Sequence, residues 1–95
     1  MTAMNITTAH QILKASGFNV CIIDADKGQF CCQSFVSGKR VYASCYQNLK
    51  QGCLITNGDD YHELPMGTDI VQRVVLEALR RKSELVEACV EPISA

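Results

Sequence analysis

Apolar residues recur at helical spacing in the last third of the chain. From Asp69 to Cys89 they form one stripe along a predicted amphipathic helix, and Thr68 is suited to be its N-cap. Pro92 disfavours helical backbone at the residue before it, so the helix is expected to end before that proline. The apolar stripe is expected to bury four residues against a sheet: Val74, Val75, Ala78 and Leu79.

A shorter helix is predicted near the start of the chain, over Thr8–Ser16. Thr8 and Gln11 have the spacing of a capping box, in which both side chains accept hydrogen bonds from backbone N–H groups that are free at the start of the helix. Gly17 stands where a left-handed residue commonly ends a helix, and Phe18 follows it as an apolar contact.

Between the two helices, strand patterns alternate with turn residues. The segment 19–24 is apolar on both faces, which predicts a strand covered on both sides within a sheet or one at a dimer contact. Short turns such as Asn57-Gly58 join neighbouring antiparallel strands. The strands are predicted over Asn19–Asp24, Gln29–Val36, Arg40–Tyr46, Cys53–Thr56 and, as a short edge strand, Asp59–Leu64.

These elements predict an α+β fold: a short N-terminal helix, an antiparallel meander of four or five strands, and a long amphipathic C-terminal helix packed on the sheet. The 95 residues suffice for a single small domain over 1–95, with 1–6 and 92–95 frayed. With 47% hydrophobic and 20% charged residues the composition is globular. Apolar runs are too short for a membrane span and no leader pattern is visible, so a cytoplasmic protein without membrane contact is expected.

The six cysteines are interpreted as free, reduced and structural. Most stand in apolar runs, where a thiol behaves as a small hydrophobe. Cys31 and Cys32 are adjacent, so on a strand their side chains point to opposite faces. The spacing matches no standard zinc site, and neither a metal nor a cofactor is predicted. A metal- or thiol-dependent sensor or enzyme is kept as an alternative. The cysteines are Cys21, Cys31, Cys32, Cys45, Cys53 and Cys89.

No set of catalytic residues is recognisable. Only His10 and His62 are available as histidine bases, and glycine-rich phosphate-binding motifs are absent. The paired acids Asp59 and Asp60 follow a turn, which accounts for them without catalysis. The protein is therefore expected not to be an enzyme.

Two charged surfaces are candidates for binding. An acidic hairpin is predicted to dock on a basic partner through Asp59, Asp60, Tyr61 and Glu63. The alternative surface is basic and aromatic, as nucleic acid would require, although glutamates interrupt it and the net charge is −1. This second surface comprises Lys39, Arg40, Tyr42, Tyr46, Arg80 and Arg81.

The sequence thus favours a small non-enzymatic protein-interaction module. A regulator, or an inhibitor of the kind that phages encode against a host nucleic-acid-handling complex, fits this size and composition. A protein partner is expected and a homodimer is left open. A nucleic-acid-binding protein that uses the strand face and the basic residues is the alternative.

Overall fold

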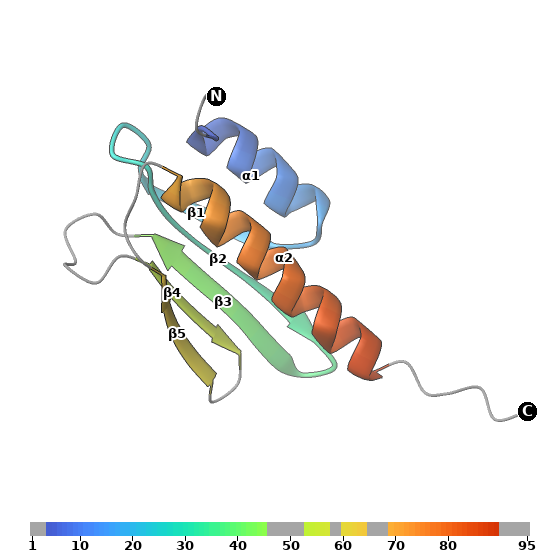
Figure 1. The fold of residues 1–95 in the computed structure, drawn as a ribbon. Helices are drawn as coiled ribbons and strands as arrows, with labels where there is room; N and C mark the ends of the chain where they lie inside the picture. The colour runs from blue at the N-terminus through green and yellow to red at the C-terminus, as the bar shows by residue number, and fades with distance from the viewer. Residues whose placement is uncertain (1–3, 46–52, 58–59, 65–68, 90–95) are drawn as a thin grey trace, which may run out of the picture.

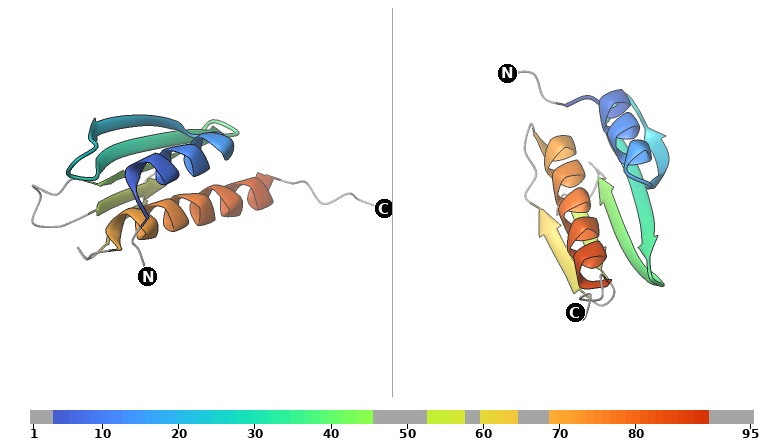
Figure 2. Two further views of the ribbon diagram at one scale, coloured as in Figure 1. Left: turned by 90° about the horizontal axis from the view of Figure 1, so that it is seen from above. Right: turned by 90° about the vertical axis from the view of Figure 1, so that its right-hand side faces the viewer.

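The computed structural model describes residues 4–45, 53–57, 60–64 and 69–89. Five strands form one antiparallel sheet in the order β1-β2-β3-β4-β5, and both helices lie on the same face of it (Figures 1 and 2). The predicted α+β class, with the C-terminal helix packed on an antiparallel sheet, is confirmed. The elements are α1 (Ile6–Ala15), β1 (Asn19–Asp24), β2 (Gln29–Val36), β3 (Lys39–Cys45), β4 (Cys53–Asn57), β5 (Asp60–Leu64) and α2 (Ile70–Cys89).

Helix α1 begins two residues earlier than its sequence pattern predicts. Asn5 is the N-cap, and its side-chain oxygen accepts a hydrogen bond of 2.8 Å from the backbone N–H of Thr8. The predicted capping box at Thr8 is therefore wrong, because asparagine is a better N-cap than threonine and Asn5 lies one turn closer to the N-terminus. The helix start also falls inside the segment 1–6 that was expected to fray.

The end of α1 follows the sequence prediction. Gly17 has a φ of 86°, which is the left-handed region. Its N–H donates to the carbonyl of Lys14 at 3.1 Å, and the N–H of Phe18 donates to the carbonyl of Leu13 at 2.9 Å. This pair of bonds satisfies carbonyl groups that would otherwise be free at the helix end, and it turns the chain into β1.

The core lies between the sheet and the two helices. Phe30 and Cys32 of β2 and Val41 of β3 are buried on the face that the helices cover. From α2, Val74, Val75 and Ala78 are fully buried, as predicted, whereas Leu79 is half-buried at the margin of the core. Leu13 of α1 completes the contact between the two layers. Among the described residues, no helix has both the length and the apolar content needed to cross a membrane.

Strand β1 does not have the position that was predicted for it. It pairs with β2 alone and is the end strand of the sheet, with most of its side chains exposed. The prediction of a strand covered on both sides is wrong. Both helices pack on one face of the sheet, so the other face of β1 is left uncovered. The other reading of the same pattern, a dimer contact, stays a prediction.

Candidate functional site

The face of the sheet opposite the helices is the most distinctive surface of the molecule. Side chains alternate between the two faces of a strand, so the neighbours of the buried Phe30 and Cys32 point away from the core. The strand register then places exposed and half-buried residues of β1, β2 and β3 on one open face. They are Asn19, Cys21, Cys31, Gln33, Phe35, Arg40 and Tyr42.

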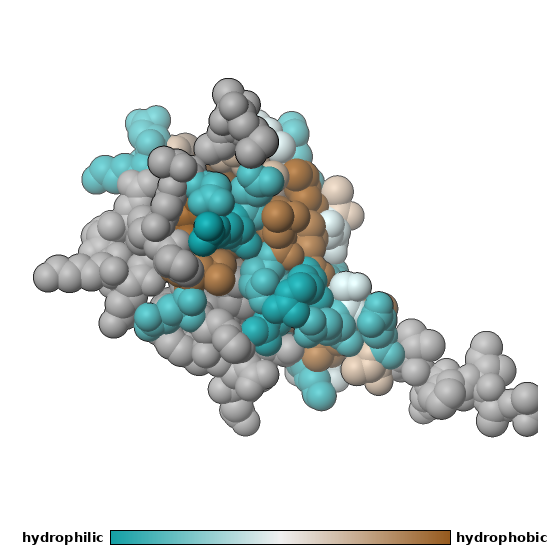
Figure 3. Space-filling view, viewed as in Figure 1, coloured by the Kyte–Doolittle hydropathy of each residue, from teal (hydrophilic) through white to brown (hydrophobic). Residues whose placement is uncertain are grey.

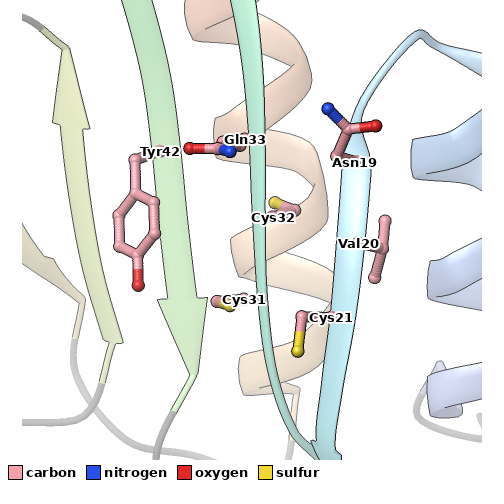
Figure 4. A pocket seen from close by; sticks show the side chains of 7 residues that line it. All are labelled: Asn19, Val20, Cys21, Cys31, Cys32, Gln33 and Tyr42. Carbon is pink, nitrogen blue, oxygen red and sulfur yellow. The ribbon is translucent and has the colours of Figure 1, made fainter.

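Strands β1, β2 and β3 also form a shallow hollow (Figure 4). Its volume of about 230 Å³ is below that of typical small-molecule sites, which are about 300–1,000 Å³. Because the hollow is also open to solvent, it suits contact with a macromolecular surface better than enclosure of a substrate. Asn19, Val20, Cys21, Cys31, Cys32, Gln33 and Tyr42 line it.

Aromatic and cationic side chains gather at the β2–β3 hairpin end of this open face. The guanidinium of Arg40 lies 5.2 Å from the ring centroid of Tyr42. Phe35 is the strand partner of Arg40, and 59% of its surface is exposed. Tyrosine, phenylalanine and arginine are the residue types enriched in protein interfaces.

The outer edge of the sheet is apolar as well. Ile22 and Ile23 of β1 are 40% and 45% exposed. The pairing of β1 with β2 is irregular between Ile22 and Asp24, which leaves Ile23 without a register partner. An exposed apolar strand at a sheet edge offers both side chains and unpaired backbone groups to another chain.

The thiols divide between the core and the open face. Cys32 and Cys45 are buried, as predicted for structural cysteines. Cys21 is exposed and Cys31 is half-buried, so the prediction of core packing is wrong for these two. Both cysteines are next to core residues along their strands, but their side chains lie on the open face, which the helices do not cover. None of these four cysteines is in a disulfide.

Burial acts on the acidity of two of these thiols. The pKa of Cys32 is raised to about 12, first by burial and then by the neighbouring Cys31, against a backbone hydrogen bond at Ala43 that lowers it. The pKa of Cys31 is also raised, first by burial and then by Cys21, while a hydrogen bond with the Tyr42 side chain lowers it. Both thiols therefore hold their protons at neutral pH.

The structure describes only part of the predicted acidic hairpin. Asp59 lies outside the described residues, and for Asp60 and Tyr61 only the strand position in β5 is described. Glu63 is exposed on the same strand, which is the opposite edge of the sheet from β1. The acidic docking surface stays a prediction.

The predicted basic surface is divided between the two sides of the sheet. Arg40 and Tyr42 lie on the open face, whereas Arg80 and Arg81 belong to α2 on the covered face. Arg80 is ion-paired with Glu77 and Glu84. Figure 3 views this covered side and shows hydrophilic side chains gathered along α2. Arg80 and Arg81 therefore do not form one surface with Arg40 and Tyr42.

The other residues of that predicted basic surface also lie apart from one another. Arg81 is only 8% exposed, and its Nε is 3.3 Å from a carboxylate oxygen of Glu77. Lys39 is exposed at the start of β3, and Tyr46 lies outside the described residues. An arginine that is buried against a carboxylate is poorly placed to contact phosphate.

Within the described ranges, no three histidine, cysteine, aspartate or glutamate side chains gather closely enough to hold a metal ion. In comparisons with known proteins, no family model, no curated protein and no solved structure matches the chain. The candidate site therefore rests on the geometry of β1, β2 and β3 alone.

Proposed function

We propose that the protein is a non-enzymatic protein-interaction module, a regulator that binds an extended segment of a partner protein along β1. The observation that supports this proposal is the combination of two properties in one strand. β1 is at the edge of the sheet, and its apolar residues Ile22 and Ile23 are exposed. Addition of a partner strand to such an edge is an established mode of peptide recognition.

Most sheet edges carry features that block strand addition, and β1 has few of them. Proline, lysine and arginine are the common blocking residues, and none of them occurs between Asn19 and Asp24. The bulge between Ile22 and Asp24 interrupts the strand only near its end. A partner segment could thus gain backbone hydrogen bonds along the first part of β1 and apolar contacts with its isoleucines.

The chemistry of the edge favours a protein segment over nucleic acid as the occupant. β1 has no cationic side chain, and its end carries Asp24, with the exposed Asp26 in the following turn. Phosphate groups would be repelled there, because nucleic-acid affinity depends on neutralisation of phosphates by lysine and arginine. The expected partner segment is extended, apolar at alternate positions and without acidic residues opposite Asp24.

The test compares two variants that each place a lysine at an exposed apolar position. Ile23→Lys introduces a charge at the β1 edge, and Leu76→Lys introduces the same charge on α2, where Leu76 is exposed. Each variant and the unmodified chain are used to capture proteins from the source cell, and the retained proteins are identified by mass spectrometry. We expect one protein to be retained by the unmodified chain and by Leu76→Lys but lost with Ile23→Lys.

The other outcomes contradict the proposal in different ways. Equal retention of that protein by both variants would show that it does not bind at β1. Loss only with an Asp59→Lys, Asp60→Lys double variant would transfer it to the acidic hairpin. Retention of nucleic acid that weakens as salt rises and is lost with Arg40→Glu would favour the nucleic-acid alternative. Retention of nothing by the unmodified chain would also count against the proposal.

A further inference from the structure

Two cysteines face each other across neighbouring strands on the open face. Cys21 of β1 and Cys31 of β2 are register partners. Cys21 and Tyr42, on the strands either side of β2, are both close enough to the Cys31 thiol to act on its pKa. Figure 4 shows Cys21, Cys31 and Tyr42 in this order across β1, β2 and β3.

The backbone geometry is compatible with a disulfide between these two residues. Facing residues of an antiparallel pair have Cα atoms about 4.5–5.5 Å apart, and disulfides span about 4.4–6.8 Å. The Cβ atoms of facing residues are generally about 4.5–5.5 Å apart, whereas a disulfide needs about 3.5–4.5 Å. The two strands must therefore move slightly closer together at this point. β1 can make this movement more readily than an inner strand because it is paired on one side only.

Cys45 of β3 and Cys53 of β4 are the other register partners among the described cysteines. Cys32 is adjacent to Cys31 in sequence but points into the core, on the opposite face from Cys21. Cys45 is likewise fully buried on the helix-covered face. An oxidant in solution therefore reaches the Cys21–Cys31 pair before either of these two thiols.

We infer that Cys21 and Cys31 form a site of reversible oxidation, at which a hydroperoxide converts the two thiols into a disulfide between β1 and β2. The inference does not depend on the proposed function, since the disulfide forms within the isolated chain. It also revises the expectation that all thiols serve only in packing.

The reaction has two balanced steps. The Cys21 thiolate attacks one oxygen of hydrogen peroxide, so that an S–O bond forms, the O–O bond breaks, and the departing hydroxide takes up a proton as water. The sulfur of Cys31 then attacks the sulfur of the resulting sulfenic acid. An S–S bond forms, the S–O bond breaks, and the hydroxide combines with the Cys31 proton as a second water. Two thiols are oxidised and one peroxide is reduced to two waters.

The surroundings assign the roles of the two thiols. Cys21 is exposed, so peroxide reaches it first. Cys31 is half-buried, and burial together with the nearby Cys21 keeps its pKa raised, which disfavours its thiolate. Cys31 therefore reacts with peroxide less readily than Cys21, and its register position opposite Cys21 places it beside the sulfur that it attacks in the second step.

The test uses hydrogen peroxide on the reduced, full-length chain. After treatment, free thiols are blocked by alkylation and the chain is cleaved with trypsin without reduction. Cleavage after Lys14, Lys27 and Lys39 places Cys21 in the peptide 15–27, and Cys31 with Cys32 in the peptide 28–39. We expect mass spectrometry to find these two peptides linked, with two hydrogen atoms lost, and the link to disappear after dithiothreitol.

Two variants of neighbouring residues distinguish the proposed pair from other pairings. Cys31→Ser should abolish the linked peptide, and Cys32→Ala should retain it. If Cys32→Ala does not fold, fragment ions of the linked peptide from the unmodified chain identify the bonded cysteine, and Cys21→Ser must also abolish the link. The inference is overturned if the link persists in Cys31→Ser, or if peroxide yields only Cys21 sulfinic acid or disulfide-linked dimers.

Discussion

Lys82 of α2 donates a hydrogen bond to the backbone carbonyl of Ser16, the residue that caps the C-terminus of α1. Its ammonium also lies 5.2 Å from the ring centroid of Phe18. A cation is favourable at this position because the carbonyl groups at a helix C-terminus carry partial negative charge. One side chain thus joins the two helices at the turn where the chain enters β1.

We expect Lys82→Met to destabilise the fold by about 1–2 kcal/mol, since it keeps the apolar stem but removes a charged hydrogen-bond donor. Urea denaturation of the variant measures this change. Lys27→Met is the matched control, because Lys27 is exposed in the β1–β2 turn. Equal stability of the two variants would mean that the Lys82–Ser16 contact contributes nothing.

Two glycines with similar backbone geometry should respond differently to alanine. Gly17 and Gly38 have φ angles of 86° and 81°. Either substitution places alanine in the left-handed region, at a cost of about 1–2 kcal/mol. A Cβ on Gly17 would lie 2.5 Å from Nζ of Lys82, whereas a Cβ on Gly38 would meet nothing within 4 Å.

We therefore expect Gly17→Ala to lower the free energy of unfolding by more than Gly38→Ala, because the Lys82 ammonium must move away from Ser16. In a Lys82→Met background the difference between the two glycine variants should shrink. A difference that persists unchanged in that background would place its cause elsewhere.

Adjacent residues of α2 provide a test of the packing of the helix on the sheet. Val75 is fully buried, whereas Leu76 is 56% exposed. Val75→Ala removes two buried carbon atoms and leaves a cavity, for an expected loss of about 2–3 kcal/mol. Leu76→Ala should change the stability by less than about 0.5 kcal/mol. Thermal denaturation measures both changes in stability. A comparable loss of stability in both variants would show that Leu76 is buried in an assembly.

The buried thiol of Cys32 should make stability depend on alkaline pH. Below its usual pKa of 9.0 both the folded and the unfolded chain hold the proton, so this group contributes no pH dependence. Between pH 9.0 and about 12 the unfolded chain releases the proton while the folded chain retains it. The free energy of unfolding then falls with rising pH, by at most about 1.4 kcal/mol per pH unit from this group.

Cys32→Ala removes that contribution. We expect the stability difference between the unmodified chain and Cys32→Ala to be constant up to about pH 9 and to shrink above it. Denaturation curves at several pH values between 7 and 11 measure the difference. A constant difference over the whole range would show that Cys32 is not desolvated in the folded chain.

Local chemistry determined the parts of the fold that the sequence predicted well. The apolar stripe of α2 follows from helical periodicity, and Val74, Val75 and Ala78 are buried accordingly. The end of α1 follows from Gly17, because few other residues adopt a positive φ without strain. Local chemistry does not decide the start of α1, since Asn5 and Thr8 are both good caps and only the contacts of the folded helix distinguish them.

Tertiary structure decided which surfaces are open and which residues meet on them. The sequence of β1 is apolar on both faces, but its exposure follows from its place at the sheet edge and from the packing of both helices on one side. Strand register brought Cys21 opposite Cys31, although ten positions separate them in the sequence. The sheet separated Arg40 from Arg80, which charge alone had grouped together. These outcomes depend on long-range pairing and layer order, which residue periodicity within a single element does not encode.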